Sequence, residues 1–306
     1  MKLKIGIFDS GIGGFTILNS LLKTRQDVEV FYLADTKRIP FGSKNFKEIR
    51  IIAKEICNFF VDKNLDALLI ACNTTNACAL DILENNLRVP CFDLINSVSE
   101  IVDKQIIGVL ATQTTVRLSY YKKAINSKKD NTIIFQQECP EFVSEIEKEK
   151  LNLDKLNSLS YLYLRPLINK NIEELILGCS HYPLIYDFLR KKLDLDKLNS
   201  LSDLYLRPLI NKNIEELILG CSHYPLIYDF LRKKLDSNIK IIDPSLALIK
   251  KFNESFAISE TDRYESISLE NVKFFVTSER DEFSNKVKFW LGINKEIRLV
   301  NLRSNV

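Results

Sequence analysis

The chain has 306 residues, about the combined length of two domains, because a single core stops growing near ~250–300 residues. Hydrophobic residues make up 46% of it and charged residues 27%, and its formal net charge of +3 is too nearly balanced to indicate a nucleic-acid-binding surface. Its apolar runs fall short of the roughly 18 residues that a membrane helix needs, so we expect neither a membrane span nor a nucleic-acid partner.

Strands and helices alternate along the first part of the chain. Apolar runs predict four strands, at Lys4–Phe8, Val28–Leu33, Leu65–Ala71 and Val89–Phe92. Between them, apolar residues at helical spacing predict three helices: one that ends near Lys23, one at Phe46–Lys63 and one at Thr75–Asn86. The segment Ala34–Ser43, which carries Pro40 and Gly42, is expected to be a loop.

A second alternating series follows. Its predicted strands are Ile106–Leu110, Thr132–Gln136, Ile172–Leu177 or its copy Ile214–Leu219, and Ile239–Ile242, before a last strand at Val272–Thr277 and a helix at Glu282–Leu291. Such alternation indicates an α/β fold of two similar domains with parallel sheets and helices on both faces. We expect residues 1–96 with 243–306 to form the first domain, residues 97–242 the second, and the active site to lie between them.

An internal repeat is the most unusual feature of the sequence. Leu153–Asp194 and Leu195–Asp236 are 42-residue blocks that differ only where Tyr161 of the first becomes Asp203 of the second. Natural solenoids diverge between repeats and usually need at least three units, so a recent tandem duplication or a sequence-assembly error explains the blocks better. Without one block the chain would have 264 residues (306 minus 42), and we expect only one copy to occupy a given place in the core.

The cysteines of the chain predict thiols rather than disulfides. There are seven, without paired spacings, and Met1–Ile5 runs directly into a strand with no room for a signal peptide. Both observations favour a reducing cytoplasm. Four of the seven are expected to be small apolar residues of the core or surface: Cys57, Cys78, Cys91 and Cys139.

Small polar residues gather where predicted strands end, which is where open parallel sheets bind ligands. They form four segments, Asp9–Gly11, Pro40–Gly42, Cys72–Thr75, and Cys179–His181 with its copy Cys221–His223. In the last two, a cysteine directly follows a buried strand and precedes a helix.

The two cysteine segments suggest proton transfer. A helix N-terminus favours anions, so we expect the pKa of such a thiol to fall below its ordinary value of about 8.5. Asp9 and His181 or His223 could exchange protons with the thiols. Inverting a stereocentre without a cofactor needs a base on one face and an acid on the other, and two matched thiols can exchange those roles.

Four motifs in this order resemble the glutamate racemases of the aspartate/glutamate racemase family. They are FDSGIGG at Phe8–Gly14, ADTKRIPFG at Ala34–Gly42, ACNTTNA at Ala71–Ala77 and GCSHYPL at Gly178–Leu184, and the likeness continues through LATQTT at Leu110–Thr115 and the tail around Val272–Gly292. The resemblance implies a cofactor-independent, cytoplasmic racemase of L- and D-glutamate that supplies D-glutamate for peptidoglycan. It also implies a homodimer.

The resemblance assigns residues to roles. It makes Cys72 and either Cys179 or Cys221 the two acid/bases, and it assigns substrate contacts to Asp9, Ser10, Phe41, Gly42, Asn73, Thr74, and Ser180 with His181 or Ser222 with His223. Phe41 stands where the family usually has Tyr, which removes a hydroxyl but keeps a backbone contact. Ser180 or Ser222 replaces the usual Thr and keeps the hydroxyl.

Other interpretations of the same residues are weaker. A zinc site at Cys179 and His181 would need Cys72 as a third ligand. The glycines at Gly11–Gly14 are not followed by Gly-Lys-Ser/Thr, so a nucleotide P-loop is not indicated. Asp9 is not followed two residues later by the second acid of a haloacid-dehalogenase-type hydrolase. Aspartate racemase, a metal-dependent hydrolase and an inactive binding protein stay as alternatives, with no metal or cofactor expected.

The sequence also bears on which copy is packed. If Leu198, Leu201, Tyr205 and Leu209 form the buried face of a helix, position 203 points away from it. Asp203 suits solvent better than Tyr161 does, so this pattern slightly favours the second copy as the native one.

Overall fold

The structure is a computed structural model of the chain. It describes residues 2–141, 172–178, 216–218, 240–242, 244–256 and 268–302, together with residues 145, 152, 155, 158, 159, 162, 163, 166, 167 and 170. The chain divides into two compact units, Met1–Ser97 with Ser245–Val306, and Val98–Pro244. Each unit contains its own sheet.

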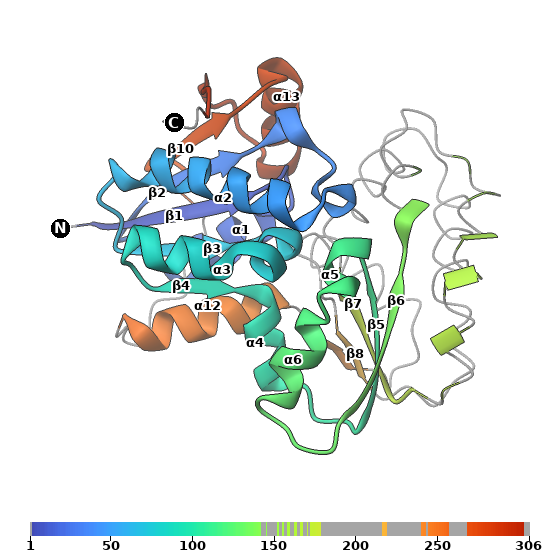
Figure 1. Ribbon diagram of the computed structural model, residues 1–306. Coiled ribbons are helices and arrows are strands. Elements are labelled where there is room, and N and C mark those ends of the chain that lie inside the picture. Colours follow the sequence, from blue (N-terminus) through green and yellow to red (C-terminus); the bar gives the residue numbers. More distant parts are fainter. Residues whose placement is uncertain are drawn as a thin grey trace. The chain divides into compact units, whose positions relative to one another are not determined.

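The first unit is built on a six-stranded sheet in the order β11-β10-β2-β1-β3-β4, and every pairing in it is parallel (Figure 1). Its strands are β1 (Leu3–Asp9), β2 (Val28–Ala34), β3 (Ala67–Ile70), β4 (Cys91–Asp93), β10 (Val272–Val276) and β11 (Ile297–Leu299). The predicted α/β class is confirmed. The short strand β11 was not predicted, since three residues are too few to show a periodicity.

Helices connect these strands, and crossover geometry decides which face each one covers. They are α1 (Phe15–Thr24), α2 (Phe46–Val61), α3 (Asn73–Leu87), α4 (Leu94–Ile101), α12 (Pro244–Ser255) and α13 (Arg280–Leu291). The chain moves from β1 to β2 in one direction and from β2 across to β3 and β4 in the other. Because such crossovers are right-handed, α1 lies on one face and α2 and α3 lie together on the other, as Figure 1 shows.

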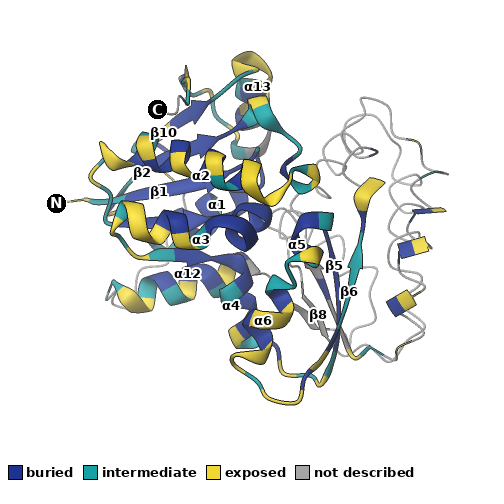
Figure 2. Cartoon of the chain, in the orientation of Figure 1, coloured by how far each residue is buried: buried dark blue, intermediate teal, exposed yellow. Residues whose placement is uncertain are grey.

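Residues from both ends of the chain share the core of the first unit. Phe15 of α1 packs against Tyr32, Phe274 and Phe283, with ring centroids 5.3, 6.1 and 5.5 Å away. The last three rings come from β2, β10 and α13, and all four side chains are fully buried or nearly so. Figure 2 shows the strands β1, β2 and β10 mostly in the dark blue of buried residues. Aromatic packing therefore holds the C-terminal segment on the first unit.

The second unit has a five-stranded parallel sheet in the order β6-β5-β7-β8-β9. Its elements are β5 (Ile106–Ala111), α5 (Gln113–Arg117), α6 (Tyr120–Asn126), β6 (Ile133–Glu138), β7 (Glu174–Gly178), β8 (Glu216–Ile218) and β9 (Lys240–Ile242). Like β1 in the first unit, β5 lies between the two strands that follow it.

The duplicated strand occurs twice in this sheet. β7 and β8 are the same segment of the two copies, and they pair side by side from Glu174 with Glu216 to Ile176 with Ile218. Each copy of the strand has its own place in the sheet, so the expectation that only one copy occupies a given place is not contradicted. An added strand continues the hydrogen bonding of its parallel neighbour and repeats its apolar side chains, so the sheet can widen by one strand.

Two local predictions needed adjustment. The loop Ala34–Ser43 contains two short 3-10 helices, η1 (Thr36–Arg38) and η2 (Phe41–Ser43). Helix α3 begins at Asn73 rather than Thr75, which makes Cys72 its N-cap residue. Among the residues that the structure describes, no helix is long and apolar enough to cross a membrane.

Candidate active site

The predicted site residues of the first unit meet at the carboxyl ends of β1 and β3. After β1 the chain crosses to β2 on one side, and after β2 it crosses back past β1 to β3 on the other side. The gap between β1 and β3 is therefore the topological switch point, where open α/β sheets bind ligands. Asp9 ends β1, and Cys72 lies two residues after the end of β3. The structure thus brings together Asp9 and Cys72, which are 63 residues apart in the sequence (72 minus 9).

The Cys72 thiol is buried, with 2% of the residue exposed. Burial, reinforced by the negative charge of Asp9, raises its pKa to about 12, although hydrogen bonds with Thr75 and Ser10 act in the opposite direction. The sequence predicted a lowered pKa from the helix N-terminus, and that prediction was wrong in direction. Loss of hydration and a nearby carboxylate outweigh the partial positive charge of the helix end.

Asp9 is held in place by the glycine-rich segment that follows it. Its Oδ1 accepts a hydrogen bond of 2.7 Å from the backbone N–H of Gly11. The Tyr32 hydroxyl donates to the Gly11 carbonyl at 3.0 Å, and a Cβ on Gly14 would lie 2.7 Å from that same hydroxyl. A side chain at Gly14 would therefore displace Tyr32, which explains the need for glycine in this segment.

Phe41 and Gly42 lie in η2, next to this cluster. Phe41 is 1% exposed, and its ring centroid is 6.2 Å from that of Phe8, the residue before Asp9. The preceding η1 is anchored by Arg38, which contacts Glu55 of α2 and bonds Asp35 at 2.6 Å. This ion-pair network fixes the path of the loop that carries Phe41 and Gly42.

A polar network that the sequence did not reveal supports α3 behind Cys72. Asn76 in the first turn of α3 donates from Nδ2 to the carboxylate of Asp93 at the end of β4. Asp93 also accepts from the backbone N–H of Asn96 at 2.8 Å and from its Nδ2 at 2.7 Å. Asn76 was visible within the ACNTTNA motif, but its partner Asp93 ends a strand 17 residues away, so only the fold could identify the network.

Asn73 and Thr74 are the other predicted contacts on this side. They form the first residues of α3 and are 3% and 5% exposed. Their side chains therefore lie in the same buried turn as Cys72. The structure brings together every predicted site residue of the first unit.

The predicted residues of the repeat lie outside the described part of the chain. These are Cys179, Ser180 and His181 in the first copy and Cys221, Ser222 and His223 in the second. The strand that leads to Cys179 is described as far as Gly178, which is paired with Ala111 of β5. The zinc alternative needs these residues; among those the structure describes, no group of three or more His, Cys, Asp and Glu could hold a metal ion.

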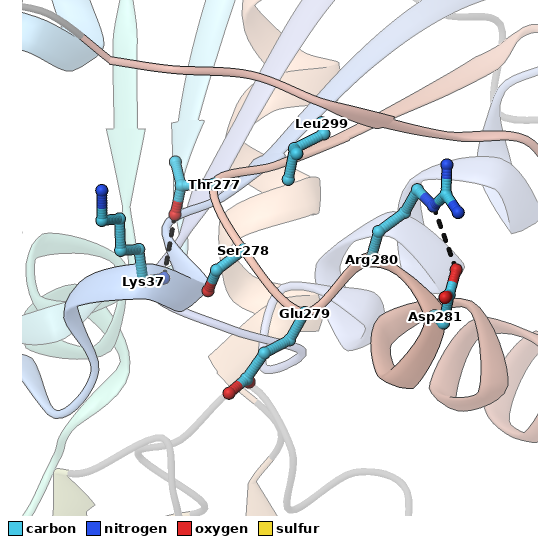
Figure 3. Close-up of a pocket in the computed structure, with 7 residues that line it drawn as sticks. All are labelled: Lys37, Thr277, Ser278, Glu279, Arg280, Asp281 and Leu299. Carbon is cyan, nitrogen blue, oxygen red and sulfur yellow. Dashed lines mark hydrogen bonds and ion pairs between the residues drawn. The ribbon is translucent and has the colours of Figure 1, made fainter.

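A cavity of about 460 Å³ lies elsewhere in the first unit, at the carboxyl ends of β10 and β11 (Figure 3). It is lined by Lys37, Thr277, Ser278, Glu279, Arg280, Asp281 and Leu299. The Lys37 backbone N–H donates to the Thr277 hydroxyl at 2.9 Å across one side of it. None of the predicted site residues lines this cavity, so its size does not make it the candidate active site.

Comparisons with known proteins cover almost the whole chain. It is 41% identical over 302 residues to the glutamate racemase of Prochlorococcus marinus (strain NATL1A), with 98% of each chain covered. It is 31% identical over 299 residues to that of Synechococcus sp. (strain CC9605), with 96% of each covered. These similarities span both units and all of the motifs.

Solved structures agree with this. The glutamate racemase of Francisella tularensis subsp. tularensis SCHU S4 in complex with D-glutamate matches with a TM-score of 0.69 and 28% identity over 99% of each chain. That of Campylobacter jejuni subsp. jejuni matches with a TM-score of 0.66 and 27% identity, over 96% of this chain and all of the other. The family model described as Asp/Glu/Hydantoin racemase matches residues 16–200. The chain belongs to the Asp/Glu/hydantoin racemase family.

Proposed function

We propose that this chain interconverts L-glutamate and D-glutamate by proton transfer between two cysteine thiols, without a cofactor. The observation that carries the proposal is Cys72, a buried thiol at the start of α3 and at the switch point of its sheet, beside Asp9 and Ser10. The choice of glutamate is supported by identities of 41% and 40% to two Prochlorococcus glutamate racemases over 98% of each chain.

In this mechanism the two thiols act on opposite faces of the α-carbon. Cys72, as a thiolate, removes the α-proton from one enantiomer: the C–H bond breaks and an S–H bond forms. The thiol of Cys179 or Cys221 then gives its proton to the other face, so its S–H bond breaks and a new C–H bond forms with inverted configuration. The reverse reaction exchanges the two roles, and no electron acceptor is needed.

The electrostatics of Cys72 suit a group that is activated only with substrate present. With a pKa of about 12, its thiol is protonated at neutral pH and ready to donate a proton. Acting as a base requires a lower pKa. Asp9 is one cause of the raised value, and the ammonium group of an amino acid beside Asp9 would offset that negative charge and lower the thiol's pKa.

The remaining contacts follow the chemistry of an amino acid with two carboxylates. Ser10, Asn73 and Thr74 supply hydroxyl and amide groups near Cys72, and Phe41 and Gly42 supply backbone groups. Serine and histidine of one repeat copy, Ser180 with His181 or Ser222 with His223, would complete the site. The histidine and Asp9 are proposed to pass protons to and from the two thiols.

The family implies that the D-glutamate product enters peptidoglycan synthesis. We propose that the chain works in the cytoplasm, where its cysteines stay reduced; the described ones, Cys57, Cys72, Cys78, Cys91 and Cys139, are free thiols. A homodimer stays a prediction.

Solvent exchange tests the function directly. The dialysed protein is incubated in deuterated water with L-glutamate or D-glutamate, with and without a chelator, while NMR follows loss of the α-proton signal. We expect exchange and racemisation from both enantiomers, undiminished by the chelator, and slower reaction with aspartate. Faster reaction with aspartate would support an aspartate racemase, loss of activity with the chelator would support a metal enzyme, and binding without exchange would indicate an inactive binding protein.

A further inference from the structure

We infer that Arg50 of α2 is a positioning residue for Cys72: through its hydrogen bond to the Cys78 carbonyl, it fixes the short helical segment at whose start the thiol lies. The inference rests on the proposed function of Cys72 and adds a residue that acts on this thiol from a neighbouring helix. All of the residues that carry it belong to the first unit.

Helix α3 is broken in its middle. Ala79 has φ −151° and ψ 21°, which is outside the helical range, so α3 consists of two helical segments, residues 73–78 and 80–87. The first segment begins directly after Cys72 and carries Asn73 and Thr74, two of the proposed substrate contacts. The direction of this first segment therefore decides where the thiol and both contacts lie.

Arg50 reaches the break from α2, which lies beside α3 (Figure 1). Its Nη1 donates to the carbonyl oxygen of Cys78, the last residue before the break, at 3.0 Å. The same nitrogen donates to Asp81 Oδ1 at 2.7 Å, and Nη2 donates to Asp81 Oδ2 at 2.8 Å. One guanidinium group thus bonds a residue on each side of the break. Helices break where a side chain enters their hydrogen-bond ladder, and Arg50 takes that part in α3.

The guanidinium group is itself held in place. Its central carbon lies 5.1 Å from the centroid of the Phe46 ring, one turn earlier in α2. Its planar fork bonds the Asp81 carboxylate through two nitrogens while one of them also donates to the Cys78 carbonyl, a geometry that a lysine ammonium does not offer. Arg50 is therefore a fixed point against which the first segment of α3 is set.

The first segment of α3 has a second anchor, nearer to Cys72. The Asn76 side chain bonds Asp93 of β4, and the Asn76 backbone N–H donates to the Cys72 carbonyl at 3.0 Å. Every residue from 73 to 78 is buried. The segment is thus held from β4 at Asn76 and from α2 at Cys78, and loss of either anchor lets Cys72 shift within the site.

Arg50 acts on Cys72 through position and not through charge. Burial and Asp9 raise the pKa of Cys72, hydrogen bonds with Thr75 and Ser10 lower it, and Arg50 is not among the causes. The charge of Arg50 is felt at Cys78 instead: burial and the neighbouring Cys72 raise the pKa of that thiol to about 12, and Arg50 lowers it. A changed reactivity of Cys72 in an Arg50 variant would therefore report a moved backbone.

Variants of Arg50 in the full chain test the inference. Arg50→Met keeps the length of the side chain but donates no hydrogen bond, and Arg50→Lys restores one donor. We expect Arg50→Met to lower kcat for both glutamate enantiomers by about 10- to 100-fold and to change KM by less than about threefold, because a displaced thiol loses its alignment with the α-carbon. Arg50→Lys, which can still donate to the Cys78 carbonyl, should keep kcat within about threefold of the parent.

The rate of Cys72 alkylation at constant pH gives a second readout, which a merely structural role would not change at this thiol alone. Mass spectrometry of the alkylated peptides measures it. We expect alkylation of Cys72, which is 2% exposed in the parent, to become about fivefold faster or more in Arg50→Met. Cys139, a buried cysteine of the second unit, should keep its rate.

Asp81→Ala is the matched control, because it removes the ion pair and leaves the bond from Arg50 to the Cys78 carbonyl. Its kcat should stay within about threefold of the parent. An equal loss of kcat in Asp81→Ala and Arg50→Met would assign the effect to the ion pair and overturn the inference.

Two further results would overturn it. Unchanged kcat and unchanged alkylation of Cys72 in Arg50→Met would make Arg50 an ordinary surface side chain, and equally faster alkylation of Cys72 and Cys139 would indicate a general loss of stability. Failure of the proposed function is a separate outcome. If the parent exchanges no α-proton with glutamate, the function fails, while the alkylation rates still decide whether Arg50 positions the thiol.

Discussion

The two sheets of this protein share the order of four strands, β2-β1-β3-β4 in the first and β6-β5-β7-β8 in the second, and differ at their edges. In the first unit the cysteine strand β3 is followed by β4, which ends in the hydrogen-bonding residue Asp93. In the second unit β7, which has the place of β3, is followed by β8, its own copy, and only then by β9. A parallel sheet can thus accept a repeated strand away from its switch point, because widening there leaves the pairing of β5 with β7 unchanged.

The comparison would be broken most completely if Cys72 were dispensable. We expect Cys72→Ala to lower racemisation in both directions by about 10⁴-fold, because one face of the substrate loses its acid/base. Circular dichroism of the substrate measures the rates. Cys57→Ala is the matched control, since that buried cysteine lies away from the switch point and its loss should leave the rates nearly unchanged. Activity within tenfold of the parent in Cys72→Ala would contradict the two-thiol mechanism.

Asp9→Asn tests how far the Asp9 carboxylate raises the pKa of Cys72 in the first unit. The amide can still accept from Gly11, but the negative charge that helps raise the pKa of Cys72 to about 12 is lost. We therefore expect thiol alkylation at Cys72 to begin at lower pH than in the parent, and kcat to fall by about 10- to 100-fold as a proton carrier is removed.

Mass spectrometry of alkylated peptides across a pH series gives this profile residue by residue. Cys57 is an internal control: burial raises the pKa of its thiol to about 11, and Asp9 is not among the causes. An unchanged profile at Cys72 would show that Asp9 does not influence the thiol.

Asp93→Ala tests the role of the residue that ends β4, the strand whose place in the first sheet corresponds to that of β8 in the second. It leaves Asn76 and Asn96 without their buried acceptor, so we expect the free energy of unfolding to fall by about 3 kcal/mol. Urea denaturation measures the loss. Asp81→Ala removes a carboxylate that is 58% exposed and paired with Arg50, and should cost less than about 1 kcal/mol. Equal effects in the two variants would refute a structural role for the buried network.

The smallest expected effect concerns the packing of β7 against β5. A methyl group on Gly178 would contact the Leu110 carbonyl and Ala111, which belong to the neighbouring strand and cannot easily shift. We expect Gly178→Ala to lower the free energy of unfolding by about 1–2 kcal/mol. Urea denaturation measures the loss. An unchanged free energy of unfolding in Gly178→Ala would contradict the close packing of β7 against β5 at this position.

Much of the fold was predictable because the relevant signals are local. Apolar runs and helical spacing identified most strands of both sheets, and each observed strand from β1 to β6 overlaps its predicted range. The motifs around Asp9 and Cys72 could be recognised as strand ends rich in small polar residues. The pKa of Cys72 could not be predicted in the same way, because it depends on how completely the folded chain removes the thiol from water.

The sequence by itself determined the fold class, the family resemblance and the existence of two nearly identical blocks, since these depend on residue order alone. Only the tertiary structure decided that both copies of the strand enter one sheet, that Asp93 supports α3 and that β7 is the copy paired with β5. The physical reason is that identical segments have identical local preferences. What distinguishes them is the neighbour against which each one pairs, and that neighbour is chosen when the sheet assembles.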